Sequence, residues 1–134
     1  MYLVDTNIWL ERLLEQERNE EVAKFLNLIP TEKLFITDFS FHSISIILTK
    51  LRKFKILTTF IHDVFIKGEV SLISLAPKDV LEIIPVMDKF KLDFDDAYQY
   101  VAAEKYDLII VSFDEDFDIT ERGRKTPIEI LKLE

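Results

Sequence analysis

LIIVSFD, the stretch Leu108–Asp114, places four apolar residues in a row directly before a short polar turn. A continuous apolar run of this length is typical of a strand covered on both faces, as in a parallel sheet. Shorter apolar runs predict three further strands, at Tyr2–Val4, Leu34–Ile36 and Val70–Leu75. The segments between them carry helical spacing, so strands and helices alternate. This order predicts an α/β fold, a three-layer α/β/α sandwich around a central parallel sheet.

The predicted helices are those segments in which apolar residues recur every three or four positions. They begin at Asn7, cover Glu20–Leu28, begin at Thr37-Asp38, cover Leu57–Ile66, begin at Pro77, and cover Asp93–Tyr106 and Thr126–Leu131. Pro77 suits a first helical turn, whereas Pro85 lies inside the same helix and predicts a kink there.

The composition limits both the number of domains and the possible chemistry. With 134 residues, 49% of them hydrophobic, the chain has room for one packed domain, residues 1–134. It contains no cysteine, two histidines and two glycines, which excludes thiol chemistry, zinc–cysteine sites and glycine-rich phosphate loops. A metal ion would therefore be held by oxygen ligands. We recognise neither a leader segment nor an apolar run of about 18 residues, so we expect a cytoplasmic protein without a membrane partner.

The negative charge is concentrated in one part of the chain. The formal net charge is −8, and residues 88–118 hold ten carboxylates against three lysines. Such a balance disfavours a protein that grips nucleic acid by bulk electrostatics, because that mode depends on basic patches. The concentration of acids instead points to a local site.

Two carboxylates lie where parallel sheets place their ligands. Asp5 ends the first predicted strand, and Asp114 closely follows the last one. In open parallel sheets, ligands bind outside the carboxyl ends of the strands, near the point where strand order reverses. A helix cap or turn is the alternative interpretation of each residue taken alone. Together, at equivalent ends of two strands, the two acids favour a site.

A third candidate lies at the start of the predicted helix over Asp93–Tyr106. Asp93 has the character of an N-cap, and Asp95 and Asp96 follow it in the first turn. A cap and the helix dipole explain one or two acids there, but not all three. Asp95 and Asp96 differ by about 100° around a helix, so we expect only one of them, Asp96, to face a shared pocket.

Bringing Asp5, Asp96 and Asp114 together requires a positive charge among them. Two like charges about 4 Å apart repel by about 4 kcal/mol at an effective dielectric constant near 20. A divalent cation relieves this repulsion, and hard oxygen ligands select Mg²⁺ or Mn²⁺. Such an ion can activate water and neutralise a phosphodiester, so the pattern indicates phosphodiester hydrolysis.

The same residues make the sequence resemble the PIN-domain family, which includes VapC-like toxins. The resemblance rests on Val4-Asp5-Thr6-Asn7, on Asp96-Ala97 followed by Ala102-Ala103, on Val111–Phe117 and on the closing Thr126-Pro127 helix. It implies the parallel sheet flanked by helices and an acidic pocket that cuts RNA with Mg²⁺ or Mn²⁺. It makes Asp5, Asp96 and Asp114 the catalytic metal carboxylates and Asp116 a further metal ligand. It matches Thr6, Asn7 and Ser112 to positions that orient the pocket. An endoribonuclease activity, an antitoxin partner and a homodimer are also implied.

One position departs from the family pattern. The family carries a glutamate near the start of the helix after the second strand, and here Ser43 takes that place, with His42 just before it. A serine hydroxyl is neutral and short, so we expect weaker metal binding, with a second metal weak or absent. We include His42 and Ser43 among the pocket residues, His42 as an unconventional member, although a partly buried structural histidine is the commoner case. Asp38 is expected to be the N-cap of that helix; the alternative, that it compensates for the missing glutamate, requires a rotated or shifted helix start.

The departure at Ser43 leaves a second hypothesis open, a PIN-like protein without catalysis that binds RNA or protein. A phosphatase of the haloacid-dehalogenase type requires a second aspartate two residues after Asp5, and Asn7 stands there. A receiver domain requires an early acid pair and a lysine after a late strand, and neither is laid out here. The basic segment Lys50–Lys55 is interpreted as a solvated helix end, with a contact to an RNA backbone as the alternative.

Overall fold

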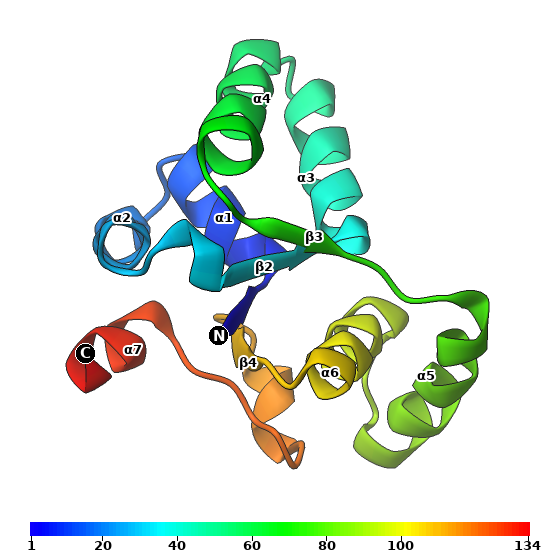
Figure 1. Cartoon of the computed structure of the whole chain (residues 1–134). Coiled ribbons are helices and arrows are strands. Elements are labelled where there is room, and N and C mark those ends of the chain that lie inside the picture. The colour runs from blue at the N-terminus through cyan, green and yellow to red at the C-terminus, as the bar shows by residue number, and fades with distance from the viewer.

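The central layer of the protein is a parallel sheet of four strands in the order β3-β2-β1-β4 (Figure 1). The computed structural model describes all residues, 1–134. The strands are β1 (Tyr2–Val4), β2 (Leu34–Thr37), β3 (Ser71–Ile73) and β4 (Ile109–Val111). The chain adds β2 and β3 on one side of β1 and then returns to place β4 on the other side. Strand order therefore reverses between β1 and β4, which creates a crevice at their carboxyl ends.

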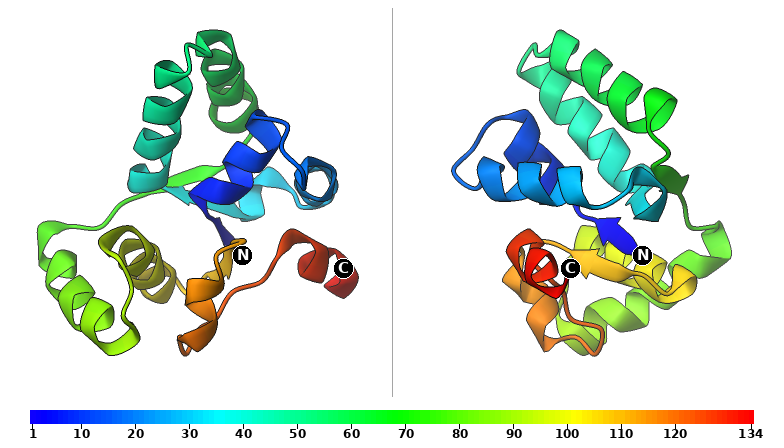
Figure 2. Two further views of the ribbon diagram at one scale, coloured as in Figure 1. Left: turned by 180° about the vertical axis from the view of Figure 1, so that it is seen from behind. Right: turned by 60° about the vertical axis from the view of Figure 1, so that its left-hand side comes forward.

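Helices cover both faces of this sheet, which confirms the predicted three-layer arrangement (Figures 1 and 2). They are α1 (Thr6–Leu13), α2 (Asn19–Leu28), α3 (Asp38–Lys50), α4 (Phe54–Ile61), α5 (Pro77–Phe90), α6 (Phe94–Tyr106) and α7 (Pro127–Leu133), with short helical segments η1 (Thr31–Lys33), η2 (His62–Lys67) and η3 (Glu115–Ile119). Helices α1 to α4 lie over one face and α5 and α6 over the other, while α7 packs against α2. None of these helices combines the length and the apolar character that a membrane span requires.

Alternation along β1 divides the apolar core between the two faces. Tyr2 and Val4 belong to the cluster shared with α1 to α4, whereas Leu3 belongs to the cluster shared with α5 and α6. Successive side chains of a strand point to opposite faces, so a strand of three residues contributes to both cores. The register that pairs Val4 with Val111 then fixes which residues follow the two strands side by side.

The structure corrects several expectations about the elements. Helix α4 begins at Phe54, before the predicted Leu57, and continues as the π-helical η2. Ile109 is 41% exposed, so β4 is not covered on both faces along its whole length. Thr37, not Asp38, is the N-cap of α3, because its hydroxyl accepts a hydrogen bond from the amide of Ser40. Pro85 does lie inside α5 (Pro77–Phe90), as the sequence predicts.

Candidate active site

The acidic residues converge because β1 and β4 are neighbours in the sheet. The amide of Asp5 donates a hydrogen bond to the carbonyl of Val111 over 2.9 Å, which extends the strand pairing by one residue. Ser112 and Asp114 follow from the end of β4, and Asp96 enters from the first turn of α6. Segments more than 90 residues apart in sequence therefore meet at the strand-order reversal.

Asp5 is buried and surrounded by hydrogen-bond donors. Its Oδ1 accepts from the Thr6 amide at 2.9 Å and from Gln99 Nε2 at 3.1 Å. Its Oδ2 accepts from the Ser112 hydroxyl at 2.7 Å and from Asn7 Nδ2 at 3.4 Å. Burial raises the pKa of Asp5, while the hydrogen bonds from Ser112, Thr6 and Gln99 act in the opposite direction. The carboxylate is thus held in a fixed orientation by groups that favour its charged form.

Asp96, Asp114 and Asp116 form a cluster that could hold a metal ion. One carboxylate oxygen of each lies within 4.8 Å of the others. Asp96 is 9% exposed. Burial, followed by the negative charges of Asp114, Asp95 and Asp5, raises the pKa of Asp96 to about 8. Asp116 is exposed, and its pKa is raised, mainly by the charge of Asp114 and to a smaller extent by desolvation. A divalent cation would relieve this repulsion.

The donor set fits Mg²⁺ or Mn²⁺. All the groups offered are carboxylate oxygens, the ligands that these hard cations prefer. The longest contact of Asp5 is the one from Asn7 to Oδ2, and Asn7 also donates to the Ser112 hydroxyl at 3.2 Å. The Oδ2 lone pair of Asp5 that Asn7 contacts is therefore available to a cation, because Asn7 can keep its hydrogen bond to Ser112.

A cavity of about 320 Å³ lies over these acids. Its polar lining comes from the end of β1, from α1, α3 and α6, and from the segment after β4: Asp5, Thr6, Asn7, Ser40, Ser43, Asp95, Asp96, Gln99 and Asp114. Ser112 does not line it and lies behind Asp5 as a donor. His42 is exposed, not partly buried, with its ring 5.8 Å from that of Phe41, and it is not among the lining residues. Asp116 belongs to the carboxylate cluster but lies outside this lining.

Two residues line this cavity that the sequence pattern does not place there. Asp95 lines the cavity together with Asp96, although only one of them was expected to face it. The second is Gln99, the buried donor from α6 to Asp5, for which the sequence motifs give no prediction. Its position three residues after Asp96, on the same face of a helix, is the signal that would have found it. Asp38, in turn, bonds Tyr98, whose hydroxyl donates to Asp38 Oδ1 at 2.7 Å.

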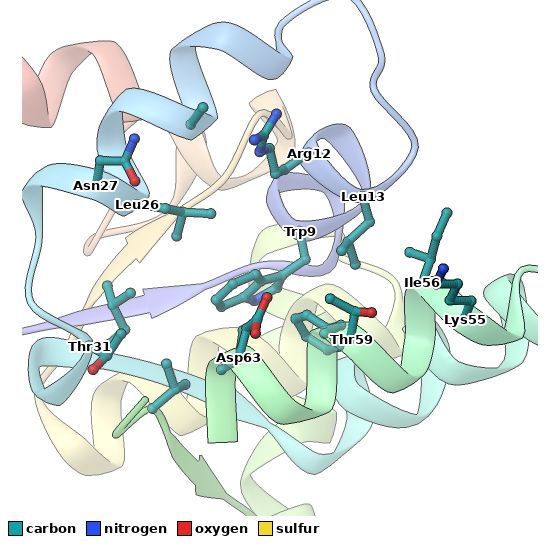
Figure 3. Close-up of a pocket in the computed structure, with 15 residues that line it drawn as sticks. Trp9, Arg12, Leu13, Leu26, Asn27, Thr31, Lys55, Ile56, Thr59 and Asp63 are labelled. Atoms are coloured by element: carbon teal, nitrogen blue, oxygen red, sulfur yellow. The ribbon is translucent and has the colours of Figure 1, made fainter. Parts of the chain in front are cut away.

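A second, larger cavity of about 610 Å³ lies between α1, α2 and α4 (Figure 3). Nine of its 15 lining residues are hydrophobic, among them Trp9, Leu26 and Ile56. Arg12 and Lys55 also line it and are exposed. Trp9 is 2% exposed, and its indole Nε1 has no hydrogen-bond partner. The cavity is therefore apolar and carries cations among its exposed residues.

The fold and the acidic site together define a class of α/β protein that gathers carboxylates at the ends of two neighbouring parallel strands. The sequence matches the PIN domain family over residues 2–123, so the chain belongs to the PIN-domain family. No curated protein sequence matches the chain.

Solved structures share the fold at low sequence identity. VapC20 of Mycobacterium tuberculosis, described as a toxin that cleaves the sarcin–ricin loop, gives a TM-score of 0.76 at 13% identity, over 91% of this chain and 96% of that one. FitAcB of Neisseria gonorrhoeae gives 0.74 at 18% identity, over 96% and 99%. A toxin–antitoxin complex from Klebsiella pneumoniae gives 0.69 at 19% identity, over 95% and 98%. These similarities extend over nearly the whole of each chain.

Proposed function

We propose that residues 1–134 form a single PIN-type endoribonuclease that hydrolyses RNA phosphodiester bonds with Mg²⁺ or Mn²⁺, and that it is the toxin of a toxin–antitoxin pair. The observation that carries the proposal is the convergence of Asp96, Asp114 and Asp116 within 4.8 Å, in a family-matched chain with Asp5 lining the same cavity as Asp96 and Asp114. Carboxylates so close together repel one another, and a cation bound among them relieves the repulsion.

The side chains would divide the work as follows. Asp96, Asp114 and Asp116 would hold the ion, and Asp5, which lies outside that cluster but lines the same cavity as Asp96 and Asp114, would supply a further oxygen. Bound there, a divalent ion lowers the pKa of a water molecule and offsets the charge of the phosphodiester. Burial raises the pKa of Asp96 to about 8, so Asp96 would have to lose its proton in order to act as a ligand.

The groups around Asp5 keep it in position. Ser112, Thr6 and Asn7 all donate to its carboxylate, which restricts the rotation of the Asp5 side chain. Ser43 contributes only a neutral hydroxyl to the cavity. A second metal would therefore be held weakly or not at all.

The assignment as a toxin with a partner is supported by the similar structures. Their titles name a toxin that cleaves the sarcin–ricin loop and a toxin–antitoxin complex. We propose an antitoxin and a second copy of the chain as protein partners, with action on RNA in the cytoplasm. The cavity between α1, α2 and α4 suits the apolar face of an antitoxin helix that carries acids opposite Arg12 and Lys55 and no acid opposite Asp63.

Incubation with a panel of structured and single-stranded RNAs in Mg²⁺ or Mn²⁺ tests the activity. Wild-type protein should cut at least one RNA internally, and Asp96→Asn should reduce the rate by at least a hundredfold. Lys132→Ala, on the exposed end of α7, is a matched control that should cut as wild type. Cleavage that survives Asp96→Asn would assign the activity to a contaminant.

The second candidate function is a PIN-like module that binds RNA or protein without cutting. Ser43 favours it, because the residue that lines the cavity at the family's glutamate position is neutral. Binding of an RNA in the gel-shift assay, with no cleavage of the whole panel at saturating Mn²⁺, would support this candidate over the nuclease.

A further inference from the structure

Gln99 links three of the elements that build the acidic cavity. It lies in α6, is 2% exposed, and donates from Nε2 to Asp5 Oδ1 over 3.1 Å. Its Oε1 accepts from the Thr37 hydroxyl over 2.6 Å. Thr37 ends β2 and Asp5 follows β1, so the three side chains form one buried hydrogen-bonded chain across the sheet.

The direction of this chain is fixed by the start of α3. The Thr37 oxygen accepts a hydrogen bond from the Ser40 amide at 3.0 Å, so the hydroxyl proton is free to point to Gln99. A hydroxyl that donates requires an acceptor, which places the Gln99 carbonyl toward Thr37 and its NH₂ group toward Asp5. The helix cap favours this orientation of the Gln99 amide, and the Asp5 carboxylate, which only accepts, favours it too.

The hydrogen bonds of Gln99 also connect the segments that carry two of the acids, Asp96 and Asp5. Gln99 lies one helical turn beyond Asp96, on the same face of α6. Its bond to Asp5 ties the helix that carries Asp96 to the loop that carries Asp5. Repulsion among the acids acts to separate them when no cation is present, and this bond opposes the separation.

We infer that Gln99 is a positioning residue that holds Asp5 in its ligand orientation before a divalent cation arrives, with Thr37 setting the direction of the Gln99 amide. The inference rests on the proposed metal-dependent function. Groups that orient a metal ligand in this way change metal affinity by about 10- to 100-fold when removed.

Calorimetric titration with Mn²⁺ alone tests the inference without any activity assay. Gln99→Met keeps the length and the apolar contacts of the side chain but lacks both hydrogen bonds, and it should weaken Mn²⁺ binding by at least about tenfold. Tyr98→Phe is the control at the adjacent residue of α6. It removes a hydroxyl that donates to Asp38 and does not contact Asp5, so this variant should bind Mn²⁺ as wild type does.

Substitution at Thr37 provides a second and independent measurement. Thr37→Ser keeps the hydroxyl and should retain wild-type affinity, whereas Thr37→Val removes it and should weaken Mn²⁺ binding. Thermal unfolding in the presence of a chelator identifies any variant that has lost its fold. If Gln99 and Thr37 had only a structural role, their substitution would lower the melting temperature, but the variants that still fold would bind Mn²⁺ with wild-type affinity.

The outcomes distinguish the inference from the function on which it rests. Wild-type Mn²⁺ affinity in folded Gln99→Met, or equal affinity in Thr37→Val and Thr37→Ser, overturns the inference and leaves the proposed function standing. Absence of Mn²⁺ binding by the wild-type protein overturns the metal-dependent function itself, and the inference with it.

Discussion

The Ser112 hydroxyl donates a 2.7 Å hydrogen bond to Asp5 Oδ2, although 107 residues separate the two in sequence. The bond exists because β4 lies beside β1 in parallel register, so that the residues following each strand emerge together. Ser112 is fully buried, and its hydroxyl also accepts from the Asp114 amide at 2.9 Å. A single hydroxyl thus connects two of the proposed metal ligands.

Replacing Ser112 by alanine should destabilise the protein. The substitution leaves the buried Asp5 carboxylate and the Asp114 amide each short of a partner, and losing such a bond costs about 1 to 3 kcal/mol. Urea unfolding at neutral pH, compared with Ser74→Ala at an exposed loop position, measures the difference. Equal unfolding free energies for Ser112→Ala and wild type would show that the bond contributes nothing to the fold.

The binding of Mn²⁺ should depend on pH through Asp96. Burial and neighbouring acids raise the pKa of Asp96 to about 8, so below that pH the metal-free protein carries a proton that the ion must displace. Affinity should rise by up to about tenfold per pH unit from about pH 6 to about pH 8 and then level off. Calorimetry in buffers of different ionisation enthalpy counts the released protons, and an affinity independent of pH in that range would contradict the prediction.

The stability of the metal-free protein should change with pH in the opposite sense for the same reason. Because the pKa of Asp96 is higher in the folded than in the unfolded chain, the folded state binds the proton more tightly. The contribution to stability is complete below about pH 4 and is lost as the pH rises to about 8. Asp96→Asn should therefore be more stable than wild type in chelator at about pH 8, and this advantage should shrink toward about pH 5. Thermal melts at the two pH values measure both differences.

A glutamate at position 43 should strengthen metal binding. Ser43 lines the cavity beside Asp5 and Asp96, so Ser43→Glu adds a carboxylate where the family pattern has one. We expect at least a tenfold gain in Mn²⁺ affinity by calorimetry, and in the RNA assay a faster cleavage. Thr49→Glu, at an exposed position of the same helix, is the control for added charge. A loss of affinity in Ser43→Glu would show that the added charge only increases the repulsion.

Trp9 makes a stability prediction away from the acids. Its indole Nε1 is buried without a partner, while its ring meets that of Phe60 edge-on at 5.4 Å. Trp9→Phe removes the unsatisfied donor and keeps an aromatic contact, so the unfolding free energy should change by less than about 1.5 kcal/mol. Trp9→Ala leaves a cavity and should cost about 3 to 5 kcal/mol. Comparable losses for the two variants in urea unfolding would contradict this account.

The order of the elements and three of the acids could be predicted from the sequence alone. Four apolar residues before Ser112 indicate a strand, and the alternation of strands and helices indicates a parallel sheet. Asp5 directly follows the first strand, and Asp114 comes three residues after the end of the last one. These features are local or depend on a rule that holds for all such sheets. The proposed metal ligand Asp96 is similarly marked by its place at the start of a helix.

Only the tertiary structure decided which side chains form hydrogen bonds between different helices and strands. Gln99 bonds Asp5 and Thr37, and Asp38 accepts from Tyr98 as well as from the Phe39 amide, while Thr37 is the N-cap of α3. The same residue type can serve as a helix cap or as the acceptor of a long-range hydrogen bond, and the sequence does not tell these roles apart. Packing decides between them because it sets which donors lie within about 3 Å. Helical spacing fixes the face on which a residue lies, but the position of the neighbouring element determines what that face meets.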